Sequence, residues 1–144
     1  MQTNVMGIWY VTQFMAMHMK DNSIKGSIIN IASINGTTKL GKNITGYCVS
    51  KAAVIQLTKA LVGELSEAKI RINCIVPGLF PTPLTDSYLS ILENRQVITN
   101  VIPLNFVATL SDLDGIILYL SSNKASRYVT GSSITVDGGM SWGG

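Results

Sequence analysis

The sequence is short of charge, of aromatic residues and of histidine. Charged residues make up 13% of its 144 residues, about half the share typical of soluble domains. Hydrophobic residues make up 47%, and this combination excludes a disordered chain, which needs few hydrophobic residues and many charges. Aromatic residues contribute only 7%, so we expect aliphatic side chains to fill the core of a domain of this length.

The chain also lacks a strong excess of one charge and any cluster of metal ligands. It has 11 Lys and Arg residues against 8 Asp and Glu residues, a net charge of +3. Because the basic residues are scattered, we expect no nucleic-acid partner. A single histidine (His18) and two cysteines (Cys48 and Cys74) predict neither a metal site nor a disulfide framework. Both cysteines lie in apolar runs, which favours a reduced, cytoplasmic setting.

No apolar run is long enough to span a membrane. The richest stretch, residues 5–19, contains Thr12, Gln13 and His18, and it is both too short and too polar for a bilayer. The first four residues lack the positive charge that begins a signal peptide. We therefore expect no membrane partner and interpret this stretch as a buried helix.

Helix-like and strand-like runs alternate along the chain. Apolar residues at helical spacing predict helices over residues 4–20, 47–68 and 84–98 (a helix or a mobile lid), and one that begins with a capping-box pattern at Ser111 and Asp114. Short β-branched runs predict strands over residues 27–32, 70–76 and 133–136, and small polar residues mark a loop over 35–46.

This order predicts an α/β fold. Near-continuous apolar strands separated by helices are typical of a parallel sheet covered on both faces, here about three strands of a doubly wound sheet. Ligands of such folds bind at the carboxyl ends of the strands. The rule points to Ser33, to Pro77 and Gly78, and to the turn at Gly138 and Gly139.

Tyr47 and Lys51 lie one helical turn apart at the start of a predicted helix, so their side chains share a face. A nearby ammonium favours the phenolate and lowers the pKa of a tyrosine, which can then exchange a proton with an alcohol or carbonyl oxygen. Ser33 ends a predicted strand and could hold that oxygen. The alternatives are an ordinary solvated Tyr/Lys pair and a serine that only starts a turn.

Four blocks of sequence stand in a characteristic order. They are Gly-Ser-Ile-Ile-Asn-Ile-Ala-Ser (26–33), Tyr-Cys-Val-Ser-Lys-Ala-Ala (47–53), Arg-Ile-Asn-Cys-Ile-Val-Pro-Gly (71–78) and Tyr-Val-Thr-Gly-Ser-Ser-Ile-Thr-Val-Asp-Gly-Gly (128–139). With these blocks, from about Asn4 to Trp142, the sequence resembles the short-chain dehydrogenase/reductase family. The resemblance implies a Rossmann-type fold and hydride transfer between NAD or NADP and an alcohol/carbonyl pair.

Matched by position, the resemblance also implies site residues. Tyr47 would be the catalytic acid/base, Lys51 would lower its pKa and bind the nicotinamide ribose, and Ser33 would position the substrate oxygen. Asn4 matches the asparagine that holds a proton-relay water; its alternative is a helix cap. Asn35 lies in the loop that would contact substrate.

The same resemblance implies contacts with the cofactor. The residues concerned, besides Tyr47 and Lys51, are Pro77, Gly78, Phe80 (through its backbone) and Thr82. Taken singly, Pro77 and Gly78 could only end a strand and Thr82 could only belong to a turn. Their occurrence together favours the cofactor site.

The sequence departs from the family in one large respect. It has no G-x-G-x-x-G turn, the feature that binds the pyrophosphate of a dinucleotide. We therefore expect residues 1–144 to form a partial domain, the C-terminal half of the fold, without the dinucleotide-binding half and without tight NAD(P)H binding by itself. Three interpretations remain open: part of a dehydrogenase, an inactive product, and a non-catalytic oligomerising module.

Within the family, the spacing of the segments resembles sugar-acid and polyol dehydrogenases such as gluconate 5-dehydrogenase, and also 3-oxoacyl-carrier-protein reductases. Phe106 stands where relatives often have an arginine. The resemblance further implies a homodimer or homotetramer formed through helices 4–20 and 47–68. The apolar face at this subunit contact would consist of Ala52, Ala53, Ile55 and Gln56. The alternative is that these residues pack on the sheet of their own chain.

Overall fold

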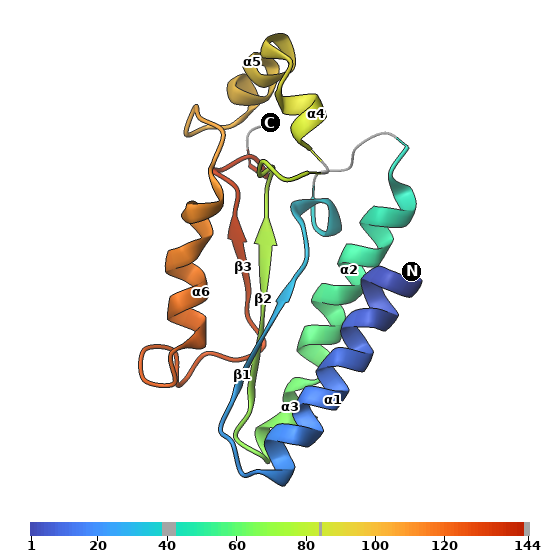
Figure 1. The fold of residues 1–144 in the computed structure, drawn as a ribbon, viewed down its shortest axis with the longest axis vertical. Coiled ribbons are helices and arrows are strands. Elements are labelled where there is room, and N and C mark those ends of the chain that lie inside the picture. Colours follow the sequence, from blue (N-terminus) through green and yellow to red (C-terminus); the bar gives the residue numbers. More distant parts are fainter. Residues whose placement is uncertain (39–42, 84, 143–144) are drawn as a thin grey trace.

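Three parallel strands form the centre of the structure, a computed structural model that describes residues 1–38, 43–83 and 85–142. They are β1 (Ser27–Ile31), β2 (Arg71–Pro77) and β3 (Ser133–Val136), in the order β1-β2-β3 (Figure 1). The central strand β2 is buried along almost its whole length, as expected for a strand of β-branched residues covered on both faces. The predicted α/β class and parallel sheet are confirmed.

Helices cover both faces of this sheet. On one side lie α1 (Ile8–Asp21), α2 (Thr45–Ala60) and α3 (Val62–Ser66), and on the other lies α6 (Asp114–Ser121) (Figure 1). Two short helices, α4 (Asp86–Leu89) and α5 (Leu92–Val101), lie beyond the carboxyl ends of the strands. The remaining turns are a π-helix η1 (Gln2–Gly7) and the 3-10 helices η2 (Ile34–Gly36) and η3 (Leu110–Leu113).

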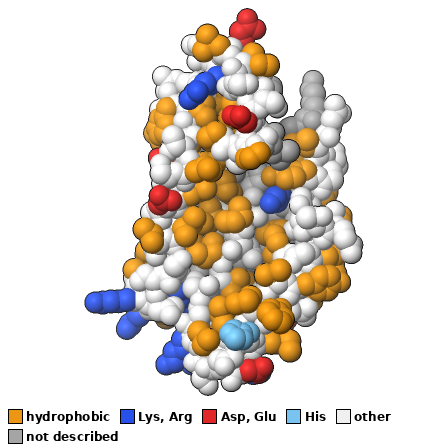
Figure 2. Space-filling model, viewed as in Figure 1, with side chains coloured by type: hydrophobic (Ala, Val, Ile, Leu, Met, Phe, Trp, Pro, Cys, Tyr) orange, Lys and Arg blue, Asp and Glu red, His pale blue; other side chains and the backbone are white. Residues whose placement is uncertain are grey.

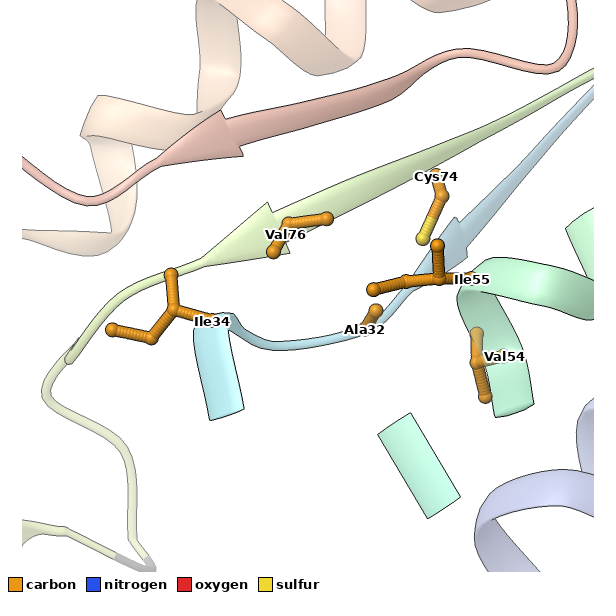
Figure 3. Close-up of a cluster of buried hydrophobic side chains, with 6 residues drawn as sticks. All are labelled: Ala32, Ile34, Val54, Ile55, Cys74 and Val76. Carbon is orange, nitrogen blue, oxygen red and sulfur yellow. The ribbon is translucent and has the colours of Figure 1, made fainter. Parts of the chain in front are cut away.

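Aliphatic side chains fill the core, as the low aromatic content predicts. One buried cluster joins the end of β1, η2, α2 and β2 (Figure 3), and it consists of Ala32, Ile34, Val54, Ile55, Cys74 and Val76. A second cluster lies nearer the start of the strands and consists of Leu57, Leu61, Leu65, Ile70 and Ile72. Together they fasten α2 and α3 to the sheet, so the first residues of α2 are held at the carboxyl end of β1.

The structure corrects several predicted boundaries. The helix expected over 4–20 begins with the π-helical turn η1, and the helix expected over 47–68 starts earlier and is divided at Leu61 into α2 and α3. The segment 84–98 contains two short helices instead of one, and residue 84 lies outside the described residues, as do residues 39–42 of the predicted loop. Helix boundaries depend on local capping, which apolar spacing does not encode.

The predicted capping box is displaced by two residues. Thr109 and Asp112 form it, since the Asp112 carboxylate accepts hydrogen bonds from the backbone N–H of Thr109 (2.7 Å) and from its hydroxyl (2.9 Å). Ser111, which the sequence analysis placed at the cap, instead shares a hydrogen bond with the Thr109 hydroxyl at 2.8 Å. Both Thr-x-x-Asp and Ser-x-x-Asp fit the pattern, and the 3-10 turn η3 selects the earlier one.

The apolar face expected at a dimer contact is only partly available. Ile55 is 9% exposed and belongs to the core cluster of Figure 3, so for this residue the alternative of packing on the sheet holds. Ala52 and Gln56 are exposed. On α1, by contrast, large apolar side chains face solvent, including Val11, Met17 and Phe14, the last 72% exposed.

A second apolar surface follows the sheet edge at β1. Among the described residues, β1 pairs only with β2, and a groove of about 700 Å³ runs between β1 and α1, lined mainly by apolar side chains. Figure 2 shows hydrophobic side chains gathered along the middle of this face, between the two helix layers. An edge of this kind is a surface at which polypeptides pair.

The turn that follows β3 is organised by Asp137. Its carboxylate accepts hydrogen bonds from the N–H groups of Gly139 (2.9 Å) and Ser141 (2.7 Å) and from the Ser141 hydroxyl. Gly138 and Gly139 have φ of +63° and +88°, a region that side-chain-bearing residues rarely adopt. Burial alone would raise the pKa of Asp137, but the hydrogen bonds from Ser141 and Gly139 outweigh it and lower the pKa.

We expect Asp137→Asn to reduce the free energy of unfolding at pH 7 by roughly 1 kcal/mol, the scale of a charge-assisted hydrogen bond that is partly exposed. A carboxylate with a lowered folded pKa stabilises the fold above its unfolded pKa of about 3.9 and loses that contribution as pH falls through the folded value. Urea unfolding at pH 7 and at pH 3 should therefore show a difference between wild type and variant that shrinks in acid. Asp21→Asn, at the exposed end of α1, is the control; an equal loss there at pH 7, or a pH-independent difference, would contradict the role of Asp137.

Candidate active site

A cavity of about 590 Å³ lies at the carboxyl ends of β1 and β2, a size typical of small-molecule sites. All the site residues predicted from the sequence line it except Asn4: Ser33, Asn35, Tyr47, Lys51, Pro77, Gly78, Phe80 and Thr82. The third turn that the strand-end rule indicated, at Gly138, lines a separate hollow of about 210 Å³ together with Phe106.

Ser33 follows β1 directly and begins the turn η2. Its backbone is extended, its side chain is buried, and its Oγ accepts a hydrogen bond from the N–H of Asn35 at 3.2 Å. The turn lies directly on α2, because a Cβ at Gly36 would lie 2.6 Å from the backbone N of Ala52 and 2.6 Å from the backbone C of Lys51. Ser33 thus starts a turn, as the alternative interpretation had it, and that turn is packed against the helix that carries Tyr47 and Lys51.

Tyr47 and Lys51 lie in the first turns of α2 and share a face. The Lys51 Nζ is 5.6 Å from the centroid of the Tyr47 ring, a distance that allows a cation–π contact, and it donates a hydrogen bond to the backbone oxygen of Ile31 at 3.1 Å. Burial lowers the pKa of Lys51, whereas the neighbouring Cys74 acts in the opposite direction. Tyr47 is 36% exposed and lines the cavity.

Asn4 does not line the cavity; it lines the groove between β1 and α1. It belongs to the body of η1, whose cap position is Met1, so the interpretation of Asn4 as a helix cap is wrong. Its Nδ2 donates a hydrogen bond to Ser50 Oγ at 3.1 Å, and Ser50 Oγ donates to the backbone oxygen of Tyr47 at 2.7 Å. Asn4 and Lys51 both line the groove beside β1, and Lys51 alone of these residues also lines the cavity.

The segment after β2 forms the opposite wall. Gly78 is packed against the residue that follows β3, since a Cβ there would lie 2.7 Å from the Cβ of Asp137. The backbone oxygen of Phe80 accepts a hydrogen bond from Thr85 Oγ1 at 2.7 Å, and the hydroxyls of Thr82 and Thr85 lie 3.1 Å apart. The sequence analysis missed Thr85; the Thr-Pro-x-Thr pattern over residues 82–85 is the local signal that points to it.

The apolar part of the cavity wall was also missed. It consists of Ile31, Ala32, Ile44, Leu79, Leu110 and Leu113. Leu110 and Leu113 come from η3, far along the chain from β1 and α2, and no local pattern marks them as site residues. They keep one side of the cavity apolar, which strengthens hydrogen bonds made inside it.

No group of three or more His, Cys, Asp or Glu side chains in residues 1–38, 43–83 and 85–142 is placed to hold a metal ion. Among the helices of the same residues, none combines the length and the apolar character needed to cross a membrane.

Almost the whole chain matches a known family. A family model described as "Enoyl-(Acyl carrier protein) reductase" matches residues 1–141. The chain belongs to the short-chain dehydrogenase/reductase family. The cavity lined by Ser33, Tyr47 and Lys51 at the strand ends therefore lies in a member of the family that the sequence resembles.

Named members of the short-chain dehydrogenase/reductase family are similar to most of this chain. D-arabinitol 2-dehydrogenase (ribulose-forming) of Scheffersomyces stipitis is 38% identical over 141 residues, 96% of this chain and 51% of the relative. Human (3R)-3-hydroxyacyl-CoA dehydrogenase is 38% identical over 138 residues, 95% of this chain and 51% of the relative.

The fold of this chain is also similar to solved structures of the family. A gluconate 5-dehydrogenase from Burkholderia cenocepacia, solved in complex with NADP and tartrate, superposes with a TM-score of 0.88 at 30% identity, over 95% of this chain and 52% of that one. This chain thus spans about half the length of the relatives it matches.

Proposed function

We propose that this chain carries the catalytic residues of an oxidoreductase that interconverts an alcohol and a carbonyl compound with a nicotinamide cofactor. The observation that supports the proposal most is the convergence of Ser33, Tyr47 and Lys51 on one cavity at the strand ends. The named relatives of this chain are dehydrogenases. Because this chain spans only about half of their length, the activity of the whole protein is part of the proposal.

In this mechanism Tyr47 moves the proton of the substrate oxygen. In the oxidative direction the phenolate oxygen of Tyr47 accepts the proton of the alcohol O–H, and in the reductive direction the phenol returns it to the carbonyl oxygen. The Ser33 hydroxyl donates a hydrogen bond to the same oxygen and holds it beside Tyr47. The Lys51 Nζ lies 5.6 Å from the centroid of the Tyr47 ring, so its ammonium group stays beside the site of proton transfer.

The cavity fits the nicotinamide end of a cofactor. Its volume of about 590 Å³ admits a ring and a ribose, and its wall offers an ammonium at Lys51 and a hydroxyl at Thr82 for polar groups, with backbone at Pro77, Gly78 and Phe80. A nicotinamide held by these residues would supply the hydride chemistry at the substrate carbon. The gluconate 5-dehydrogenase relative was solved with NADP; the residues of this chain favour neither NAD nor NADP, because the phosphate-binding turn is not among them.

We further propose a polyol or a sugar acid as substrate, on the basis of the arabinitol and gluconate relatives. Asn35 and Ser33 offer polar groups for additional hydroxyls at the cavity wall. A 3-oxoacyl or 3-hydroxyacyl thioester is the second candidate, favoured by the human relative of equal identity and by the apolar wall of Ile44, Leu110 and Leu113.

The same protein is proposed to be a homodimer or homotetramer in the cytoplasm. The exposed Val11, Phe14 and Met17 of α1 supply an apolar surface that a second copy would cover. Cys48 and Cys74 are buried free thiols, in agreement with a reducing setting. Catalysis and oligomer formation are compatible, so this apolar surface does not by itself favour a non-catalytic oligomerising module.

Purified protein assayed at millimolar NAD(H) and NADP(H) tests the proposal. D-arabinitol, gluconate and a (3R)-3-hydroxyacyl-CoA are compared by the absorbance of reduced nicotinamide, and we expect turnover of a polyol or sugar acid that Ser33→Ala reduces by about 10-fold or more. A preference for the thioester would support the second candidate substrate instead of a polyol or sugar acid. Failure to turn over any alcohol or carbonyl compound, in a protein shown to be folded by circular dichroism, would contradict the proposed function.

A further inference from the structure

Ser50 connects α2, the helix that carries Tyr47 and Lys51, to η1. It lies in α2 directly before Lys51, is 1% exposed, and lines neither the cavity nor the groove beside β1. Its Oγ lies 3.1 Å from Asn4 Nδ2, across 46 residues of sequence, and 2.7 Å from the backbone oxygen of Tyr47. Neither the spacing of the motif nor the composition of the helix had indicated a role for this side chain.

The hydrogen-bonding capacity of a hydroxyl fixes the direction of this chain of bonds. A serine hydroxyl has one proton, and Ser50 uses it on the Tyr47 carbonyl, which can only accept. Ser50 must therefore accept from its second neighbour, so the Asn4 amide must turn its NH₂ group toward Ser50. The Oδ1 of Asn4 is then turned away from Ser50 and remains an acceptor.

We propose that Ser50 is a positioning residue for the proton-transfer site. Its hydroxyl fixes the orientation of the Asn4 amide and ties it to the backbone of Tyr47, so that Asn4 presents an acceptor beside Lys51 at the groove that both residues line. The Asn4 side chain comes from η1, a π-helical turn, a geometry that recurs at functional sites. This inference rests on the proposed function for its catalytic consequence, but not for the hydrogen bonds themselves.

The same helix offers a matched control at Thr58. This residue is fully buried two helical turns further on, its Oγ1 donates to the Val54 carbonyl at 2.9 Å, and it accepts from Asn30 Nδ2 at 3.0 Å. Thr58 therefore repeats the arrangement of Ser50, a hydroxyl that lies between a helix carbonyl and an asparagine amide. Thr58 does not line the cavity and has no hydrogen bond to Tyr47. Thr58→Val removes such a pattern from the core, and Ser50→Ala removes it from the site.

Exchange of the side-chain amide protons tests the orientation directly. In ¹⁵N-labelled protein, with the Asn4 resonance identified by its loss in Asn4→Ala, we expect Ser50→Ala to raise the exchange rate of the Asn4 amide protons about 10-fold or more. Thr58→Val should leave Asn4 within about twofold and raise the rate for Asn30 instead. An Asn4 amide that exchanges equally fast in wild type and in Ser50→Ala would overturn the inference.

Kinetics separate positioning from a merely structural role. We expect Ser50→Ala to lower kcat by about 10-fold to 100-fold, to change the KM for substrate by less than about twofold, and to shift the pH profile of kcat. In an Asn4→Ala background, Ser50→Ala should have no further effect on kcat, because both substitutions break the same hydrogen bond between Asn4 and Ser50. Additive losses, or an equal shift in Thr58→Val, would overturn the positioning role.

If wild type turns over no substrate at all, the proposed function fails, and amide exchange still decides the orientation of Asn4.

Discussion

Replacing Tyr47 with phenylalanine will lower kcat/KM for alcohol–carbonyl interconversion by about 10²-fold to 10⁴-fold, the contribution typical of a positioned acid/base. The change removes one oxygen atom and leaves the ring beside Lys51. Because Tyr47 is 36% exposed at the cavity, the free energy of unfolding should change by less than about 0.5 kcal/mol. Initial rates with saturating cofactor, together with urea unfolding of both proteins, provide the comparison.

Tyr128→Phe is the matched control for this prediction. It makes the same chemical change at a side chain that is 98% exposed and lies outside the cavity. Its kcat/KM should stay within about twofold of wild type. A Tyr47→Phe protein that retains wild-type kcat/KM would remove Tyr47 from the mechanism, and equal losses in both variants would point to an effect unrelated to the acid/base role.

The second large effect is expected from Gly36→Ala. The new Cβ would lie 2.6 Å from two backbone atoms of α2, at Ala52 and Lys51, and backbone atoms of a packed helix cannot withdraw independently. We expect η2 and α2 to separate, with a loss of about 1–3 kcal/mol in the free energy of unfolding, as for overpacked sites. Since Ser33 begins η2, kcat/KM should fall more than 10-fold, on the scale of small misplacements at a site.

Gly63→Ala is the control for the contact at Gly36. Gly63 lies within α3, and a Cβ there would meet no atom within 4 Å. Alanine is the better helix former by about 1 kcal/mol, so this variant should be at least as stable as wild type and equally active. Thermal and urea unfolding of the two variants should therefore move in opposite directions; a Gly36→Ala protein with wild-type stability and activity would show that η2 and α2 are not in direct contact.

The sheet could be predicted because its strands are marked locally. The β-branched run at residues 70–76 ends at Pro77 and Gly78, and the observed strand β2 (Arg71–Pro77) differs by one residue at each end. Such runs bury both faces, so composition alone indicates a parallel strand between helix layers. Helix ends were less predictable: the capping box moved to Thr109 and Asp112 because two overlapping patterns were available and the 3-10 turn selected one.

The site was predictable to the extent that its residues are related by local geometry or by family resemblance. Tyr47 and Lys51 share a face because they are one helical turn apart, and Ser33 was expected at the site because ligands bind at the carboxyl ends of parallel strands. Thr85 and the apolar wall from η3 were missed, because their presence at the cavity depends on how distant segments pack. The roles of the catalytic and cofactor-binding residues stay predictions.

The sequence by itself determined the α/β class, the positions of the three strands and the pairing of Tyr47 with Lys51, because these follow from side-chain periodicity over a few residues. Only the tertiary structure decided that Gly36 brings η2 onto α2, that Ile55 belongs to the core, and that Asn4 is held by Ser50 across 46 residues. Those contacts depend on the relative placement of whole helices on the sheet, which is set by the sum of many packing interactions and leaves no local pattern in the chain.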